Sequence, residues 1–185
     1  MIAKSPTFIL IITMVSVFIL QNTFDIDYLA FTPALALQRP WTFVTSMFLH
    51  ADVSHILFNM FALFFFGIYL ERFISMKEYM LLFFASGIVG NIGYMLTAVD
   101  STIPVIGASG GIYGIMGCLA TLRPYAIVYI YFAPMPLILA AGLWAVSEFL
   151  GLFVPSYIAH GSHLFGLLIG FFFGLYMRKR LNIMK

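Results

Sequence analysis

Charged side chains are scarce in this chain. Only 9% of its 185 residues are Asp, Glu, Lys or Arg, whereas 63% are hydrophobic, and the mean hydropathy is +1.05. A soluble domain of this length has too small an interior to hide so much apolar surface. The composition therefore predicts a multi-pass membrane protein. The formal net charge of +2 also lacks the strongly basic balance that nucleic-acid binding needs, so no nucleic-acid partner is expected.

Cysteine is nearly absent as well. Cys118 is the single cysteine of the sequence, which excludes an internal disulfide. Residues 1–21 have a basic residue and an apolar run, but no small-x-small cleavage site follows directly, so we expect a retained first helix rather than a signal peptide. Long tails, linkers and internal repeats are also missing. We therefore expect residues 1–185 to form a single transmembrane domain.

Apolar stretches separated by polar residues, glycines and prolines predict six membrane-spanning helices. The predicted spans are Thr7–Gln21, Val53–Leu70, Tyr79–Ala98, Ser109–Leu122, Met135–Val154 and Ser162–Met177. The fifth has the least certain start, because residues 127–132 are also apolar and prolines interrupt the run.

The distribution of charge predicts the orientation of these spans. Lys and Arg collect on the cytoplasmic side of membrane proteins. With the N-terminus inside, eight of the nine basic residues fall on inner segments, and only Arg39 falls outside. The outer loops instead carry Asp25, Asp27, Asp52 and Asp100. The fold class that follows is an all-α bundle of six transmembrane helices with both termini in the cytoplasm.

Polar side chains inside the predicted spans lie at a common depth. With a rise of 1.5 Å per residue, Ser109 lies about 21 Å and His163 about 22 Å above the inner boundary marked by basic residues. Asn59 lies at about 20 Å, with His55 one turn higher on the same helix face. Polar groups are costly in a bilayer and are therefore functional candidates. The irregular segment 101–108 before Ser109 further predicts a hydrated cavity that opens outward.

Glycines predict that the fourth and sixth spans pack closely. Gly166, Gly170 and Gly174 follow His163 along one stripe of the sixth span, and the fourth span is similarly rich in glycine after Ser109. Such packing would bring Ser109 against His163, and a histidine is the usual base that activates a serine hydroxyl. Glu148 is the only acidic residue that could be a third member, but its position in the fifth span does not single it out.

Three motifs in this order resemble those of rhomboid intramembrane serine proteases. Residues 107–110, Gly-Ala-Ser-Gly, resemble the family's GxSG motif. Residues 50–59 are similar to its HxxxN motif with an additional upstream histidine, and residues 163–170 to its HxxGxxxG motif. The first loop, residues 23–51, departs from the family pattern, since it reads Arg-Pro-Trp where the family often has Trp-Arg, so its internal hydrogen bonds should differ from those of the family.

The resemblance implies a role for each matching residue. Ser109 would be the nucleophile and His163 its base, and the side chains of His55 and Asn59 would stabilise the oxyanion. Tyr113 would pack against His163. The supporting residues are Gly107, Gly110, Tyr113, His50, Gly166 and Gly170, with His50 expected to be structural.

The expected activity is cleavage of transmembrane segments of membrane proteins near the outer leaflet by a Ser–His dyad. It needs no metal or cofactor; its partners would be transmembrane protein substrates and the lipid bilayer. We expect a multi-pass protein of the plasma membrane, and the sequence leaves its oligomeric state open. Two alternatives remain: an inactive rhomboid-like protein that binds membrane proteins, and a haem or metal protein ligated by His55 and His163.

Overall fold

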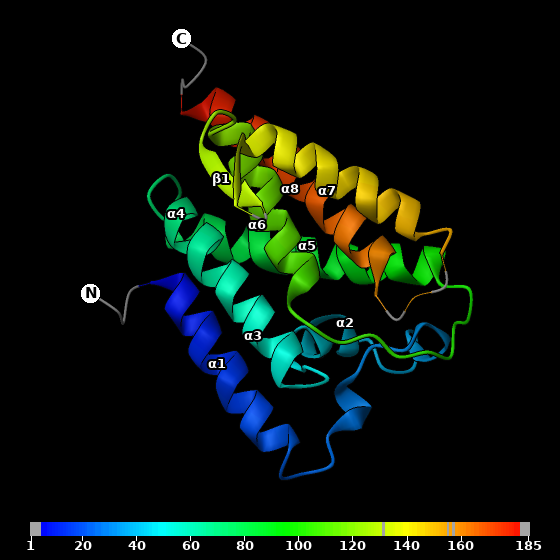
Figure 1. The fold of residues 1–185 in the computed structure, drawn as a ribbon. Coiled ribbons are helices and arrows are strands. Elements are labelled where there is room, and N and C mark those ends of the chain that lie inside the picture. Colours follow the sequence, from blue (N-terminus) through cyan, green and yellow to red (C-terminus); the bar gives the residue numbers. More distant parts are fainter. Residues whose placement is uncertain (1–4, 131, 155, 157, 182–185) are drawn as a thin grey trace.

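The computed structural model describes residues 5–130, 132–154, 156 and 158–181, and it is mostly helical (Figure 1). The helices, 3-10 turns (η2–η4), π-helical turn (η5) and strands, in chain order, are α1 (Pro6–Gln21), η2 (Asp27–Leu29), η3 (Pro33–Leu35), α2 (Thr42–Thr45), η4 (Ser46–Phe48), α3 (Val53–Ala62), η5 (Leu63–Gly67), α4 (Ile68–Leu70), α5 (Met76–Thr97), α6 (Ser109–Leu122), β1 (Ile127–Ile130), β2 (Ala133–Pro136), α7 (Leu137–Gly151) and α8 (His160–Arg180).

Helix length separates the membrane-embedded elements into two groups. Within the described residues, three helices are long and apolar enough to cross a membrane: Val53–Leu70, which joins α3, η5 and α4, together with α5 and α8. The helices α1, α6 and α7 are apolar but shorter. These six segments coincide with the six apolar stretches of the sequence. The number of spans and the inside location of both termini stay predictions.

The helices α5 and α7 begin at other residues than the sequence predicted. α5 begins at Met76, before the predicted Tyr79, because Ser75 and Glu78 form a reciprocal capping box. α7 begins only at Leu137, after the predicted Met135. Residues 127–130 and 133–136 instead pair as the antiparallel strands β1 and β2, with Met135 opposite Val128. Pro134 and Pro136 of β2, which lack an N–H, favour this extended conformation over helix.

The long loop between α1 and α3 is fixed to the helices at several points. The side chain of Gln21 accepts a hydrogen bond from the backbone N–H of His50 at 3.0 Å and donates one to its carbonyl. Asn91 of α5 donates to the carbonyl of Phe43 at 2.9 Å and to Ser46 at 3.0 Å. Within the loop, Thr45 donates to the carbonyl of Leu29 at 2.8 Å. These hydrogen bonds hold the loop against α1 and α5.

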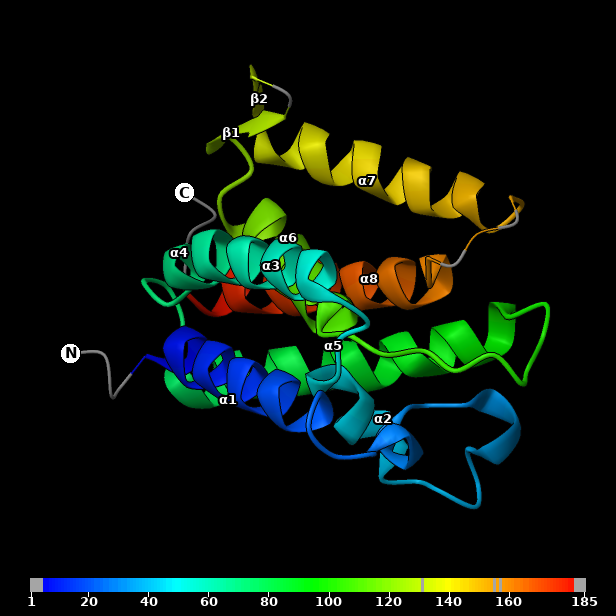
Figure 2. The same ribbon diagram turned by 60° about the horizontal axis from the view of Figure 1, so that its bottom comes forward.

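α6 is the central helix of the bundle, and Figures 1 and 2 show α5 and α8 beside it. Twelve of its residues, from Gly110 to Leu122 with the exception of Tyr113, are buried. A Cβ on Gly166 or Gly170 of α8 would meet the carbonyl oxygens of Gly110 and Gly114. Only glycine allows two helix backbones to approach this closely. The contact places the first turn of α8 beside the first turn of α6.

Candidate active site

The segment before α6 determines the position of Ser109. Val105 forms an isolated antiparallel bridge with Phe31, and the N–H of Gly107 donates to the carbonyl of Ser46 at 2.9 Å. Gly107 has a φ of +124°, a conformation that L side chains rarely adopt, and a Cβ there would lie 2.8 Å from Nε2 of His55. Ser109 follows as the first residue of α6, and no side chain in the described part of the chain caps this helix.

Ser109 and His163 form a hydrogen bond between α6 and α8. The distance from Ser109 Oγ to His163 Nε2 is 2.8 Å. When Nδ1 carries the imidazole proton, Nε2 accepts from the serine hydroxyl, which is the geometry that a base needs to activate a serine. The two residues are 54 positions apart, and the glycine contact between the helices brings them together.

Tyr113 forms one wall around the imidazole. Its ring is stacked on that of His163, with the centroids 4.4 Å apart and 6° between the planes. Tyr113 lies one helical turn after Ser109, so both side chains face α8. Its hydroxyl donates to Oε1 of Glu148 at 2.6 Å. The predicted packing of Tyr113 against the histidine is therefore present, with an additional polar contact to α7.

Glu148 of α7 is a site residue that the sequence did not single out. Its carboxylate is buried, with Oε2 2.6 Å from Nδ1 of His160 and Oε1 3.2 Å from Nδ1 of His163. The second distance is within ion-pair range, although the Nδ1–H is not aligned for a hydrogen bond. The available signal was a single acidic residue inside an apolar helix, because a lone buried charge is costly without partners.

His55 and Asn59 lie one turn apart on α3. Asp52 caps this helix by accepting the N–H of His55 at 2.8 Å, and His55 Nε2 lies beside Gly107. The side-chain amide of Asn59 donates to the carbonyl of His55 at 2.9 Å. Asn59 Oδ1 has no partner among the described residues. The structure thus places His55 beside the segment that leads into Ser109, whereas the Asn59 amide is engaged on its own helix.

His50 is fully buried before α3, and its ring contacts that of His55 with 5.1 Å between centroids. Burial lowers the pKa of His50 to about 4, and the nearby His55 adds to this effect when it is charged. Neither ring nitrogen of His50 has a hydrogen-bond partner in the described part of the chain. This environment agrees with a structural rather than a chemical role.

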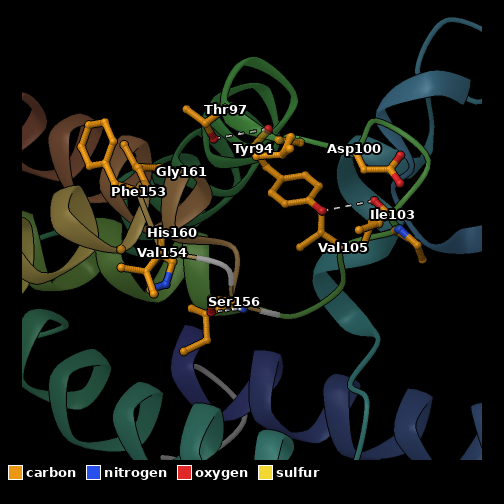
Figure 3. A pocket seen from close by; sticks show the side chains of 16 residues that line it. Tyr94, Thr97, Asp100, Ile103, Val105, Phe153, Val154, Ser156, His160 and Gly161 are labelled. Atoms are coloured by element: carbon orange, nitrogen blue, oxygen red, sulfur yellow. Dashed lines mark hydrogen bonds between the residues drawn. The ribbon is translucent and has the colours of Figure 1, made fainter.

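A cavity of about 590 Å³ lies beside the site (Figure 3). It lies between the end of α5, residues 98–105, the end of α7 and the start of α8. Tyr94 donates across it to the carbonyl of Ile103 at 3.2 Å, and His160 forms part of its wall. Neither Ser109 nor His163 is among the described residues that line it. Among the described residues, His160 connects the wall of this cavity with Glu148 beside the catalytic pair.

The arrangement of the potential ligand side chains bears on metal binding. Among those that the structure describes, no group of three or more His, Cys, Asp or Glu side chains could hold a metal ion. Of the two ring nitrogens of His163 that could bind a metal, Nε2 is hydrogen-bonded to the Ser109 hydroxyl and Nδ1 faces Glu148. The geometry gives no support to the alternative in which His55 and His163 are metal ligands.

A comparison with protein families decides the relationship that the motifs indicated. The family model of the rhomboid domain matches residues 37–180, which is most of the chain. The chain belongs to the rhomboid family. The matched region contains every site residue predicted from the sequence and also Glu148 and His160.

Several curated rhomboid proteins are similar to the chain. It is 35% identical over 131 residues to the putative rhomboid protease YdcA of Bacillus subtilis (strain 168), covering 71% of this chain and 64% of YdcA. It is 28% identical over 145 residues to rhomboid protein 1, mitochondrial, of Saccharomyces cerevisiae, covering 74% and 41%. It is 30% identical over 137 residues to RHOMBOID-like protein 6, mitochondrial, of Arabidopsis thaliana, covering 74% and 43%. This rhomboid chain thus spans less than two thirds of each of these relatives.

The names of these rhomboid relatives bear on the membrane in which the protein was expected. Two of them are named as mitochondrial, so membership of the family does not support the plasma membrane that we predicted. The family and the apolar helices do support an integral, multi-pass membrane protein.

Proposed function

We propose that this rhomboid protein is an intramembrane serine endopeptidase in which Ser109 is the nucleophile and His163 the general base. The observation that carries the proposal is the 2.8 Å hydrogen bond between Ser109 Oγ and His163 Nε2, made between the first turns of two tightly packed helices. A rigid helix–helix contact holds nucleophile and base within reaction distance before substrate arrives. The names of relatives such as YdcA, a putative rhomboid protease, agree with this chemistry.

The reaction would proceed by acyl transfer. Ser109 Oγ attacks the carbonyl carbon of the scissile peptide bond while its proton passes to His163 Nε2. The tetrahedral intermediate then collapses, the C–N bond breaks, and the same proton goes to the leaving amine. Water then gives a proton to His163 and attacks the acyl ester; the ester C–O bond breaks, His163 returns that proton to Ser109 Oγ, and the new carboxyl group is released. Protons and bonds balance over the cycle.

The negative charge that develops on the carbonyl oxygen needs donors. The backbone N–H of Ser109 and the side chains of His55 and Asn59 are the proposed ones. The side-chain amide of Asn59 has two N–H groups, one of which donates to the carbonyl of His55 in this structure. The second N–H is the proposed donor to the oxyanion, since apo sites often complete their hydrogen bonds only when substrate binds.

The substrate would be a transmembrane segment of another membrane protein. A peptide bond in a helix has its carbonyl already hydrogen-bonded, so the helix must unwind locally before Ser109 can reach it. Segments with glycine, proline or serine at the depth of Ser109 unwind at lower cost and are the expected substrates.

The test uses the detergent-solubilised protein with a single-span substrate and, separately, a fluorophosphonate probe. Wild type should cleave and become labelled, while Ser109→Ala should do neither and His163→Ala should not cleave. Ser147→Ala, an exposed serine on α7, is the matched control and should behave as wild type. Cleavage that persists in Ser109→Ala, or labelling that moves to another residue, would contradict the assignment.

A further inference from the structure

Three donor groups surround the carboxylate of Glu148, one from α6 and two from the first turn of α8. Tyr113 Oη donates to Oε1 at 2.6 Å, His160 Nδ1 lies 2.6 Å from Oε2, and His163 Nδ1 lies 3.2 Å from Oε1. Glu148 is the single polar residue among the four buried side chains of α7, the others being Leu137, Ala140 and Ala141. A charge held at this depth is retained only where partners compensate its desolvation.

The contacts with Tyr113 and His160 hold the carboxylate of Glu148 in place. The third contact sets it beside the catalytic histidine. Tyr113 and His160 already give each oxygen a short hydrogen bond, which is enough to satisfy the group. The remaining neighbour is Nδ1 of His163, the ring nitrogen opposite the one that contacts Ser109. A base that uses Nε2 must hold its proton on Nδ1, and an acceptor on that side selects this tautomer.

We propose that Glu148 is a positioning residue that orients His163 and stabilises its protonated form, so that Ser109, His163 and Glu148 act as a triad. This inference rests on the proposed function. Tyr113 and His160 hold the carboxylate in place, and the stacked Tyr113 ring prevents the imidazole from tilting out of line.

One proton moves during the attack by Ser109. When Ser109 attacks, its proton moves to Nε2 of His163 and the imidazole becomes a cation. The Nδ1 proton stays on His163 and the carboxylate of Glu148 remains an anion, so an ion pair forms at the existing 3.2 Å separation. The gain in attraction draws Nδ1 into line with Oε1, because catalytic hydrogen bonds are often long before the reaction begins. The proton on Nε2 then leaves with the amine, and the resting state returns.

A purely structural role is the competing explanation. α7 lies at the periphery, beyond α8 in the view of Figure 2, and Glu148 ties it to α6 through Tyr113 and to α8 through His160. Loss of this tie would loosen α7 without acting on His163. The experiment must therefore measure chemistry separately from folding and from substrate binding.

The variants are Glu148→Gln, which keeps the size but removes the charge, and Glu148→Asp, which keeps the charge. Ser147→Ala on the same helix is the control. We expect Glu148→Gln to lower kcat about 10²- to 10⁴-fold, because removing the anionic partner of a catalytic histidine has an effect of this size. KM and the unfolding temperature should stay near those of wild type, and Glu148→Asp should recover part of the lost kcat. A Glu148→Gln protein that is folded and retains kcat within threefold of wild type overturns the inference.

A second measurement covers the case in which Glu148→Gln does not fold. The wild-type adduct with a fluorophosphonate mimics the charged state of the transition state, with His163 protonated. Its His163 Nδ1 proton should give a strongly downfield NMR resonance, the signature of a short hydrogen bond to a carboxylate. Absence of that resonance from the labelled protein overturns the inference. A wild type that neither cleaves nor reacts with the probe overturns the proposed function, and this inference with it.

Discussion

The rings of Tyr113 and His163 are stacked face to face, with 4.4 Å between centroids and 6° between planes. The tyrosine thus restricts rotation of the imidazole about the axis along which Ser109 approaches. Its hydroxyl, which donates to Glu148, adds a second constraint on the same base. The two functions of this one side chain can be separated by substitution.

Tyr113→Phe keeps the stacked ring and removes the hydroxyl, whereas Tyr113→Ala removes both. We expect kcat to decrease in the order wild type, Phe, Ala. The step from Phe to Ala should be about two- to tenfold, since an aromatic stack is worth about 0.5–1.5 kcal/mol and about 1.4 kcal/mol is tenfold in rate. Steady-state cleavage of a single-span substrate measures this, with the exposed Tyr176→Ala as control. Equal rates for the two Tyr113 variants would contradict a role for stacking.

Asn59→Ala should lower kcat by about 10²–10³, the usual effect of removing one oxyanion donor. The loss should be smaller than that of Ser109→Ala, because His55 and the backbone still stabilise the oxyanion. Asn22→Ala is a close control, since the Asn22 amide also donates to the carbonyl four residues earlier, at 2.7 Å, but on the exposed end of α1. Complete inactivity of Asn59→Ala at wild-type thermal stability would show that this residue does more than donate one hydrogen bond.

Gly170→Ala should destabilise the protein by about 1–3 kcal/mol, because overpacking forces neighbouring atoms to shift. The new Cβ would meet the carbonyl of Gly114, which is backbone and cannot rotate away. Gly142→Ala is the matched control on α7, where a Cβ meets nothing within 4 Å. That variant should be neutral or more stable by about 0.5–1 kcal/mol from helix propensity. Thermal unfolding in detergent tests both, and a Gly170→Ala as stable as wild type would refute the close backbone contact.

His50 predicts a dependence of stability on pH. Its pKa falls from 6.5 to about 4 on folding, chiefly because of burial, so between these values the unfolded chain binds more protons than the folded one. Stability should therefore be greatest above pH 6.5, fall as the pH drops toward 4, and lose on the order of 3 kcal/mol in total. Urea or thermal unfolding in detergent across this range provides the measurement. His50→Gln should flatten the His50 part of the curve, and a wild-type curve without any slope would contradict the burial argument.

The cut in the substrate should fall in its outer half. The sequence spacing predicts that Ser109 lies about 21 Å above the inner boundary and the hydrocarbon core is about 30 Å thick, so the scissile bond should lie roughly 9 Å below the outer boundary. The residue before the bond should be small, as the family resemblance implies. Mass spectrometry of both fragments locates the cut. Consistent cleavage in the inner half would contradict both the depth and the predicted orientation.

Spacing along the chain was sufficient to predict which residues meet. Residue spacing predicted nearly equal depths for Ser109 and His163. The glycines along their two helices predicted that these helices pack closely against each other. In the structure, Ser109 Oγ and His163 Nε2 are 2.8 Å apart. Their catalytic roles stay predictions, as does the count of spans, because neither follows from a distance.

Glu148 and the hairpin of β1 and β2 could not be predicted in the same way. Helical periodicity says which residues of α7 share a face, but not which neighbour that face meets. The position of Glu148 depends on Tyr113 and His160, which lie 35 and 12 residues away. The hairpin residues are as apolar as a span, and only their pairing across residues 127–136 distinguishes strand from helix.

The abrupt start of α6 at Ser109 has an electrostatic consequence. The aligned peptide dipoles of a helix amount to roughly half a positive charge at its N-terminus, and no side chain of the described residues neutralises the first turn of α6 by capping it. Ser109 Oγ therefore lies in a field that favours negative charge, and the field belongs to the backbone. Replacing the side chains of His55 and Asn59 would leave it intact. With 14 residues, α6 is about 21 Å long, shorter than a hydrocarbon core of about 30 Å, so we expect its positive end to lie below the membrane surface, at the depth of the reaction.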